Sequence, residues 1–121
     1  MEVIFRVSEN ILIACIKGDI DHHGAAPLRN SVDKAMKAFR CKNLILDFSG
    51  VSFMDSAGIG VVLGRYKRLS KTSGNIYISG CSLYIEKLLS MAGVFTLISK
   101  ADTYDEAVSI MTGREQLRME V

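Results

Sequence analysis

The sequence predicts a single-domain α/β protein with a mixed β-sheet, in which an N-terminal hairpin precedes alternating strands and helices that pack on the sheet. Three observations lead to this fold class. The length of 121 residues suits one domain. Two strand-like segments joined by a turn signal open the chain. After them, short apolar runs alternate with segments in which apolar residues recur at helical spacing.

The hairpin and the first helix occupy the N-terminal third. Residues 2–7 and 11–17 are strand-like, and Ser8-Glu9-Asn10 between them is a turn signal. A loop is predicted from Gly18 to Gly24, and Pro27 stands where the first turn of a helix tolerates proline. The inner face of this helix is predicted to carry Leu28, Val32, Ala35, Met36 and Phe39.

A buried strand and a second helix follow. Residues 43–48 form a nearly continuous apolar run, typical of a parallel strand that is covered on both faces. After a loop over residues 49–55, helical spacing predicts an inner face of Ile59, Val62, Leu63, Tyr66 and Leu69. The polar side of the same helix is predicted to be a solvated face with Arg65, Lys67, Arg68 and Lys71.

The C-terminal part continues the alternation. Residues 75–79 are predicted to be a strand, Ser82 to cap a helix that Gly93 ends, and residues 95–98 to be the last strand. The inner face of the capped helix is assigned to Ile85, Leu88, Leu89 and Ala92. Asp102 or Thr103 then caps a final helix. We assign residues 1–112 to the domain and residues 113–121 to a charged, flexible tail.

Composition excludes several functions. The formal net charge is only +2, aromatic residues make up 7% and tryptophan is absent, so a nucleic-acid partner is not expected. No apolar run approaches the roughly 20 residues of a membrane span, and the N-terminus lacks a signal peptide. Three widely spaced cysteines favour buried thiols in a reducing compartment. We therefore expect a soluble, cytoplasmic protein that is a monomer when free.

Two loops hold the candidate functional residues. The first is Gly18 to Gly24, and the second runs from Ser52 to Gly60 between a strand and a helix. Both should lie at the carboxyl edge of the sheet, where open α/β sheets gather function. Ser56 falls at the start of a helix, where free backbone N–H groups and the positive end of the dipole tolerate a phosphate. On position alone, capping by Asp55 or Ser56 is the more frequent explanation.

Other chemistry receives little support. Gly58, Gly60 and Gly64 resemble a phosphate-binding glycine pattern at the wrong spacing, and close packing of the helix on the sheet is the simpler interpretation. His22 and His23 lack a second cluster of metal ligands, so no metal or other cofactor is predicted. The sequence contains no nucleophile elbow and no placed Cys-His pair, so no catalytic residues are predicted and the protein is not expected to be an enzyme.

At these loops the sequence resembles the anti-sigma factor antagonist family, whose fold is called the STAS domain. The residues that carry the resemblance are Gly18-Asp19-Ile20-Asp21-His22-His23, Ser52 to Gly60, and Val62 to Lys67. The Asp55-Ser56-Ala57-Gly58-Ile59-Gly60 segment is fairly specific to the family. The Asp21-His22-His23 segment narrows the resemblance to its sporulation branch.

The resemblance implies partner switching. The unphosphorylated protein is expected to bind an anti-sigma factor that is a serine kinase, which releases a sporulation sigma factor. The kinase then phosphorylates the motif serine, here Ser56, and a metal-dependent serine phosphatase reverses the step. The docking surface implied by the resemblance comprises Asp21, His22, His23, Asp55, Ser56, Gly58 and Ile59.

Two alternatives stay open on the sequence. A receiver-like signalling domain has similar length and element order, and Asp47 could imitate its acceptor, although Asp19 and Asp21 are not adjacent as its acidic pair requires. A nucleotide-binding protein is suggested by the glycine pattern from Gly58 to Gly64.

Overall fold

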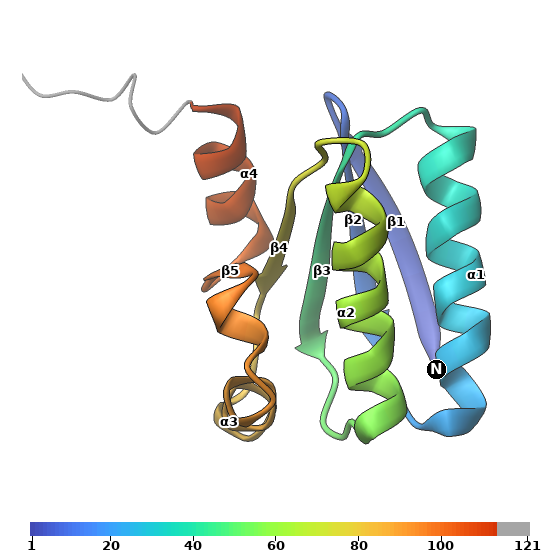
Figure 1. Ribbon diagram of the computed structural model, residues 1–121, viewed down its shortest axis with the longest axis vertical. Coiled ribbons are helices and arrows are strands. Elements are labelled where there is room, and N and C mark those ends of the chain that lie inside the picture. Colours follow the sequence, from blue (N-terminus) through green and yellow to red (C-terminus); the bar gives the residue numbers. More distant parts are fainter. Residues whose placement is uncertain (114–121) are drawn as a thin grey trace, which may run out of the picture.

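The computed structural model describes residues 1–113, which form a five-stranded sheet with helices on both faces (Figure 1). The predicted α/β fold with an N-terminal hairpin and a mixed sheet is confirmed. The elements in chain order are β1 (Glu2–Ser8), β2 (Ile11–Lys17), α1 (His22–Ala38), β3 (Asn43–Gly50), α2 (Ser56–Ser70), β4 (Ile76–Ser79), α3 (Leu83–Met91), a 3₁₀ turn (Val94–Thr96), β5 (Ser99–Ala101) and α4 (Tyr104–Thr112).

The strands lie in the spatial order β1-β2-β3-β4-β5. Strand β1 pairs antiparallel with β2, and Glu9 in the tight turn between them has a positive φ of 55°. All other neighbours pair in parallel. Because each parallel crossover returns the chain in the same direction, the carboxyl ends of β2, β3 and β4 meet at one edge, the lower edge in Figure 1.

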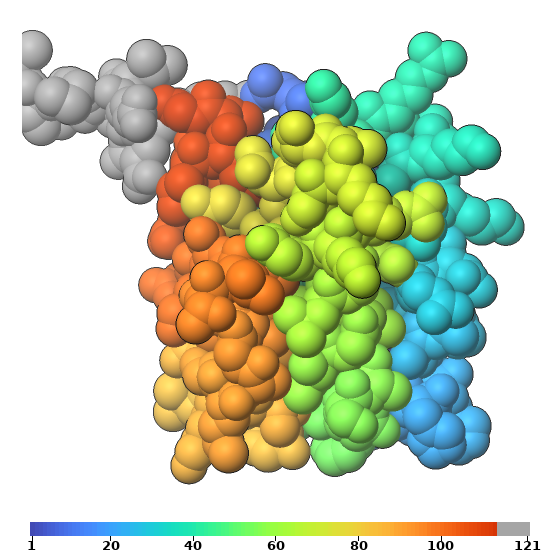
Figure 2. All heavy atoms as spheres, viewed as in Figure 1, coloured from blue at the N-terminus to red at the C-terminus, as the bar shows by residue number. Residues whose placement is uncertain are grey.

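The core has two layers, one on each face of the sheet. The larger cluster packs Leu12, Leu44 and Ile78 of the strands against helices α1, α2 and α3. The smaller one packs Ile13 and Ile45 against Ala107 and Val108 of α4. Helices α1 and α2 lie side by side in front of the sheet, and Figure 2 shows them and the α3–β5 segment covering that face. Strand β3 is buried along most of its length, as the apolar run predicted.

Helix α1 begins earlier than the sequence suggested. The loop prediction holds only to Asp21, because that residue caps a helix that starts at His22, ahead of Pro27. Pro27 therefore stands inside the helix, where it removes the N–H that would pair with the carbonyl of the exposed residue His23. The prediction of Phe39 on the inner face is also wrong, since this residue is the C-cap and is 57% exposed.

The last strand lies outside the predicted residues 95–98. Gly93 adopts a left-handed φ of 78° and starts a 3₁₀ turn over Val94–Thr96. The apolar residues Val94 and Ile98 are buried in the core without forming a strand. The strand is instead the short polar segment Ser99–Ala101, which pairs with β4 at the sheet edge. Ala92, predicted on the inner face of α3, is its exposed C-cap.

Two further predictions about single residues are corrected. Arg65 is not on a solvated face, because it is only 8% exposed and lies between α1 and α2. Of the three free cysteines, Cys41 is buried, whereas Cys15 and Cys81 are half-buried. Burial raises the pKa of Cys81 to about 12, which keeps its thiol protonated and unreactive.

The described part of the chain ends just after its last helix. Helix α4 ends at Thr112, and Gly113 closes it with a left-handed φ of 76°. Residues 114–121, which make up most of the predicted tail, lie outside the described residues. Within residues 1–113, every helix is too short or too polar to cross a bilayer.

Candidate functional site

The two candidate loops are joined at the carboxyl edge of the sheet. Gly18 N donates to Gly50 O at 2.9 Å as the chain leaves β2 and β3. Further on, Ile20 N donates to Phe53 O at 3.0 Å, and Asp55 N donates to Ile20 O at 3.1 Å. Ile20 and Met54 form an isolated parallel bridge, and each is 1% exposed. Their burial in the core fixes the residues that follow each of them.

An aspartate follows each bridge residue and begins a helix. Asp21 Oδ1 accepts hydrogen bonds from His23 N at 3.0 Å and Gly24 N at 3.1 Å at the start of α1. Asp55 Oδ1 accepts from Ala57 N at 2.8 Å and Gly58 N at 3.4 Å at the start of α2. Both residues have extended backbone, the conformation of an N-cap. The two helices therefore start side by side with the same cap.

A hydrogen bond connects the two helix starts directly. The second carboxylate oxygen of Asp55 accepts from His22 N at 3.2 Å, so Asp55 serves α1 as well as α2. The backbone hydrogen bonds from Gly24 and His23 hold the pKa of Asp21 below its usual value. Both helix dipoles present their positive ends here, and two carboxylates lie against them.

Ser56 is the first residue of the 15-residue helix α2 and is exposed. The neighbouring residue Asp55 caps the helix, so the Ser56 hydroxyl does not act as the cap. Among residues 1–113, the Ser56 hydroxyl forms no side-chain hydrogen bond, because the amides at this helix start donate to Asp55 instead. The arrangement offers an accessible hydroxyl at the positive end of a helix.

The other predicted site residues lie around the two helix starts, and they differ in how far they are exposed to solvent. His22 and His23 are exposed, with ring centroids 4.0 Å apart, while Asp21, Asp55 and Ile59 are half-buried. Gly58 is buried, and a Cβ there would lie 2.5 Å from Met54 Cγ and 3.1 Å from Ile20 O. Gly58 therefore permits the close approach of α2 to the joined loops and is not itself part of the surface.

The other glycines of the pattern do not have the packing role predicted for them. A Cβ on Gly60 or Gly64 would meet nothing within 4 Å, so neither lies against the sheet. All three glycines are inside α2, and the Gly58 N–H donates to Asp55 Oδ1, so they do not form the glycine-rich loop that cradles a phosphate. The geometry thus gives no support to the nucleotide-binding alternative based on Gly58, Gly60 and Gly64.

Asp47 does not fit the acceptor of a receiver domain. It is 4% exposed, and its two carboxylate oxygens accept from Ser49 Oγ at 2.6 Å and Ser79 Oγ at 2.7 Å. A Cβ on Gly80 would lie 2.8 Å from Asp47 Oδ1, so the chain also crosses close over it. A phosphate donor cannot reach this carboxylate without dismantling the network.

Sequence reasoning missed two features of the site. The hydrogen bond from Ser52 Oγ to Asp19 Oδ1, at 3.4 Å, adds a side-chain link between the loops. Phe53 is 42% exposed beside the capped helix starts, although it is a large apolar residue. An aromatic residue in a loop that runs from a strand into a helix was the available signal. The residues 1–113 contain no cluster of three or more potential metal ligands.

Comparison with known proteins identifies a family that covers most of the chain. Residues 2–107 match the family described as STAS domain. The anti-sigma F factor antagonist of Paenibacillus polymyxa is 32% identical over 115 residues, covering 95% of this chain and 96% of the relative. An anti-sigma-B factor antagonist of Bacillus subtilis is 29% identical over 98 residues, covering 81% and 88%.

Solved structures give the same result for the fold. The anti-sigma factor antagonist SpoIIAA in its unphosphorylated form superposes with a TM-score of 0.74 at 26% identity, covering 93% of this chain and 99% of that protein. The phosphorylated form of SpoIIAA, a Bacillus cell fate determinant, gives 0.72 at the same identity, covering 91% and 99%.

Proposed function

The chain belongs to the STAS domain family, among the anti-sigma factor antagonists, and we propose that its unphosphorylated form binds an anti-sigma factor that is a serine kinase. This binding releases a sporulation sigma factor. The kinase then phosphorylates Ser56 and the complex dissociates, and a metal-dependent serine phosphatase restores the binding form. The protein acts in the cytoplasm as a monomeric binding module rather than as an enzyme.

The observation that carries the proposal is the position of Ser56. This exposed serine is the first residue of α2, directly after the residue that caps the helix. It lies on the surface formed by the starts of α1 and α2, which Asp55 joins and which we call the platform. A partner that docks on this platform meets Ser56 together with Asp21, His22, His23 and Ile59. The buried bridge of Ile20 and Met54 beneath the platform keeps its shape fixed before docking.

Phosphorylation changes the charge of this platform more than its fold. A phosphate adds roughly −1.5 to −2 charges at neutral pH. In the free protein, the positive ends of α1 and α2 and the surrounding water tolerate that charge. In a complex, the phosphate would lie beside the carboxylates of Asp21 and Asp55 and would have to be desolvated. Docking removes the water that screens the phosphate from these two carboxylates of the same chain, so their repulsion strengthens and the complex is weakened.

Phosphate mapping and binding measurements test the proposal. The full chain is incubated with a cognate anti-sigma factor kinase and ATP, and the modified residue is located by mass spectrometry. Stoichiometric phosphate on Ser56 is expected. Ser56→Ala should bind the kinase normally and resist release by ATP. Ser56→Asp should bind about tenfold or more weakly, because one unfavourable charge contact exceeds 1.4 kcal/mol.

Ser70 provides the matched control, because it is an exposed serine at the opposite end of the same helix. Ser70→Asp adds the same charge and should leave kinase binding unchanged. Equal binding of the wild-type, Ser56→Ala and Ser56→Asp proteins would refute the switch. Phosphate on another residue, with Ser56 unmodified, would refute the assignment of the acceptor.

A further inference from the structure

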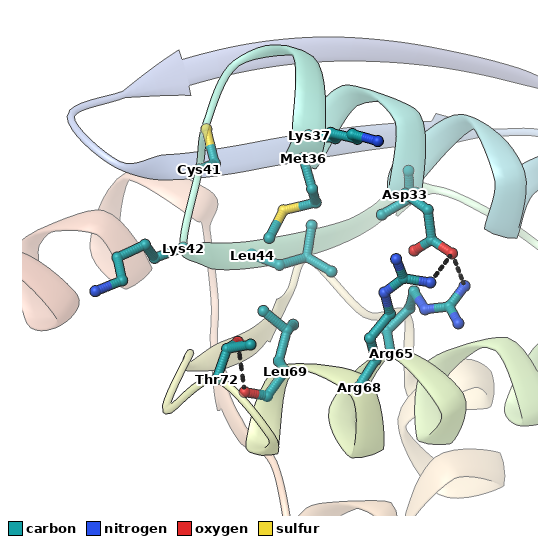
Figure 3. Close-up of a pocket in the computed structure, with 11 residues that line it drawn as sticks. Asp33, Met36, Lys37, Cys41, Lys42, Leu44, Arg65, Arg68, Leu69 and Thr72 are labelled. Carbon is teal, nitrogen blue, oxygen red and sulfur yellow. Dashed lines mark hydrogen bonds and ion pairs between the residues drawn. The ribbon is translucent and has the colours of Figure 1, made fainter.

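A pocket separates the second halves of α1 and α2, away from the platform (Figure 3). Its volume is about 460 Å³, within the roughly 300–1,000 Å³ range of small-molecule sites. Met36 of α1, Leu44 of β3 and Leu69 of α2 line its middle. Arg65 follows Ser56 by nine residues on α2, which is about 14 Å along the helix axis. The pocket is therefore distinct from the phosphorylation site.

The charged residues that line the pocket are mostly basic. Lys37, Lys42, Arg65 and Arg68 contribute positive charge, and Asp33 is the acidic residue among the lining residues. In Figure 3 the guanidinium groups of Arg65 and Arg68 reach from α2 toward Asp33 on α1 and close one end of the pocket. The lining thus combines an apolar middle with an excess of positive charge.

Arg65 carries a positive charge that the described protein neutralises only in part. It is 8% exposed, and its Nη1 lies 3.2 Å from Asp33 Oδ2. The same carboxylate oxygen accepts a hydrogen bond from Arg68 Nη1, also at 3.2 Å. Among residues 1–113, neither Nε nor Nη1 of Arg65 has a hydrogen-bond partner. A buried guanidinium that shares a carboxylate with a second arginine is costly unless a further anion approaches it.

The lining also indicates the shape of that anion. Apart from the charged groups, the pocket is bounded by aliphatic and sulfur-containing side chains and Thr72, and no aromatic ring lines it among the described residues. A nucleotide base would find no ring on which to stack. An aliphatic chain would instead be covered by Met36, Leu44 and Leu69.

We propose that this pocket binds an amphipathic anion, in which a carboxylate or phosphate headgroup is attached to an unbranched aliphatic chain. The headgroup lies at the end closed by Arg65 and Arg68, and the chain lies over the apolar middle. Burial, together with the nearby Arg68 and Arg29, lowers the pKa of Arg65, which agrees with an incompletely neutralised cation. An anion bound there would reverse this effect.

The test is a titration of the full ¹⁵N-labelled chain with decanoate, followed by amide chemical shifts. Decanoate should shift amides of residues 32–44 and 65–72 saturably. Acetate, which has the charge without the chain, and decan-1-ol, which has the chain without the charge, should not do so at equal concentration. Arg65→Met and Arg68→Met should each weaken decanoate binding about tenfold or more, as expected for losing a charge-assisted contact.

Two variants guard the result against misfolding and non-specific charge effects. The Arg68 side chain is 67% exposed, so Arg68→Met keeps the test valid even where Arg65→Met fails to fold. Lys87→Met removes an exposed cation from α3, outside the pocket, and should bind decanoate as the wild type does. The proposal is overturned by the absence of saturable shifts, by equal shifts with acetate or decan-1-ol, or by ATP binding the same residues more tightly.

Discussion

The close packing of Gly58 predicts opposite effects for the same substitution at two positions of α2. In Gly58→Ala, the new Cβ would lie 2.5 Å from Met54 Cγ, 3.0 Å from Ile20 Cγ2 and 3.1 Å from Ile20 O. Met54 and Ile20 are both 1% exposed, so neither can move aside freely. In Gly60→Ala, the new Cβ would meet nothing within 4 Å.

The magnitudes follow from two opposing contributions. Replacing glycine by alanine inside a helix stabilises it by about 1 kcal/mol. Gly60→Ala should therefore raise the free energy of unfolding by up to about 1 kcal/mol. At Gly58 the same gain is outweighed by overpacking, which costs about 1–3 kcal/mol and here involves a backbone carbonyl. Gly58→Ala should lower the free energy of unfolding by about 1–2 kcal/mol.

Urea unfolding followed by far-ultraviolet circular dichroism measures both variants. The chain is small enough for a two-state analysis, and the slope of the transition shows whether the denatured state has changed. Gly60→Ala is the matched control, because the chemical change and the helix are the same. The reasoning would be refuted by Gly58→Ala unfolding at the same or higher urea concentration than the wild type.

Two further predictions concern the caps. Asp55→Ala should lower the free energy of unfolding by about 1–2 kcal/mol. It should also speed hydrogen exchange at the amides of His22, Ala57 and Gly58, because all three donate to this carboxylate. Unchanged exchange at His22 would contradict the link between the helices. The backbone hydrogen bonds of Gly24 and His23 lower the pKa of Asp21. The stability that the Asp21 carboxylate contributes is therefore complete above the unfolded-state pKa of about 3.9. It is lost as the pH falls through the lower folded-state pKa. Asp21→Asn, which caps without titrating in this range, should lose less stability than the wild type between neutral and acidic pH in the same urea assay, and parallel losses would count against the cap.

The sequence predicted most of the fold because periodicity is a local property. The hairpin, β3 and the buried positions Leu28, Val32 and Ala35 of α1 follow from residue spacing alone. Strand β5 could not be found in this way, because Ser99–Ala101 is short and polar and exists only through its pairing with β4. The apolar residues before it satisfy the core from a 3₁₀ turn instead.

The site was predictable in part for a related reason. The placement of Ser56 after a capping aspartate is encoded within a few residues, and both loops were expected at one sheet edge. The hydrogen bond from His22 N to Asp55 depends on the exact crossing of the two loops, which no local pattern reports. Arg65 was misassigned because a charged residue at helical spacing gives no sign that a neighbouring helix will cover it.

The hydrogen bond between the two loops also determines at which stage of folding the site forms. His22 and Asp55 are 33 positions apart in the chain, with α1 and β3 between them, so their hydrogen bond requires both elements to be in place. Closing so long a segment has an entropic cost that local helix formation cannot offset. A nascent or partly unfolded chain therefore carries the serine but not the surface around it. Recognition of that surface would select finished molecules and ignore unfinished ones.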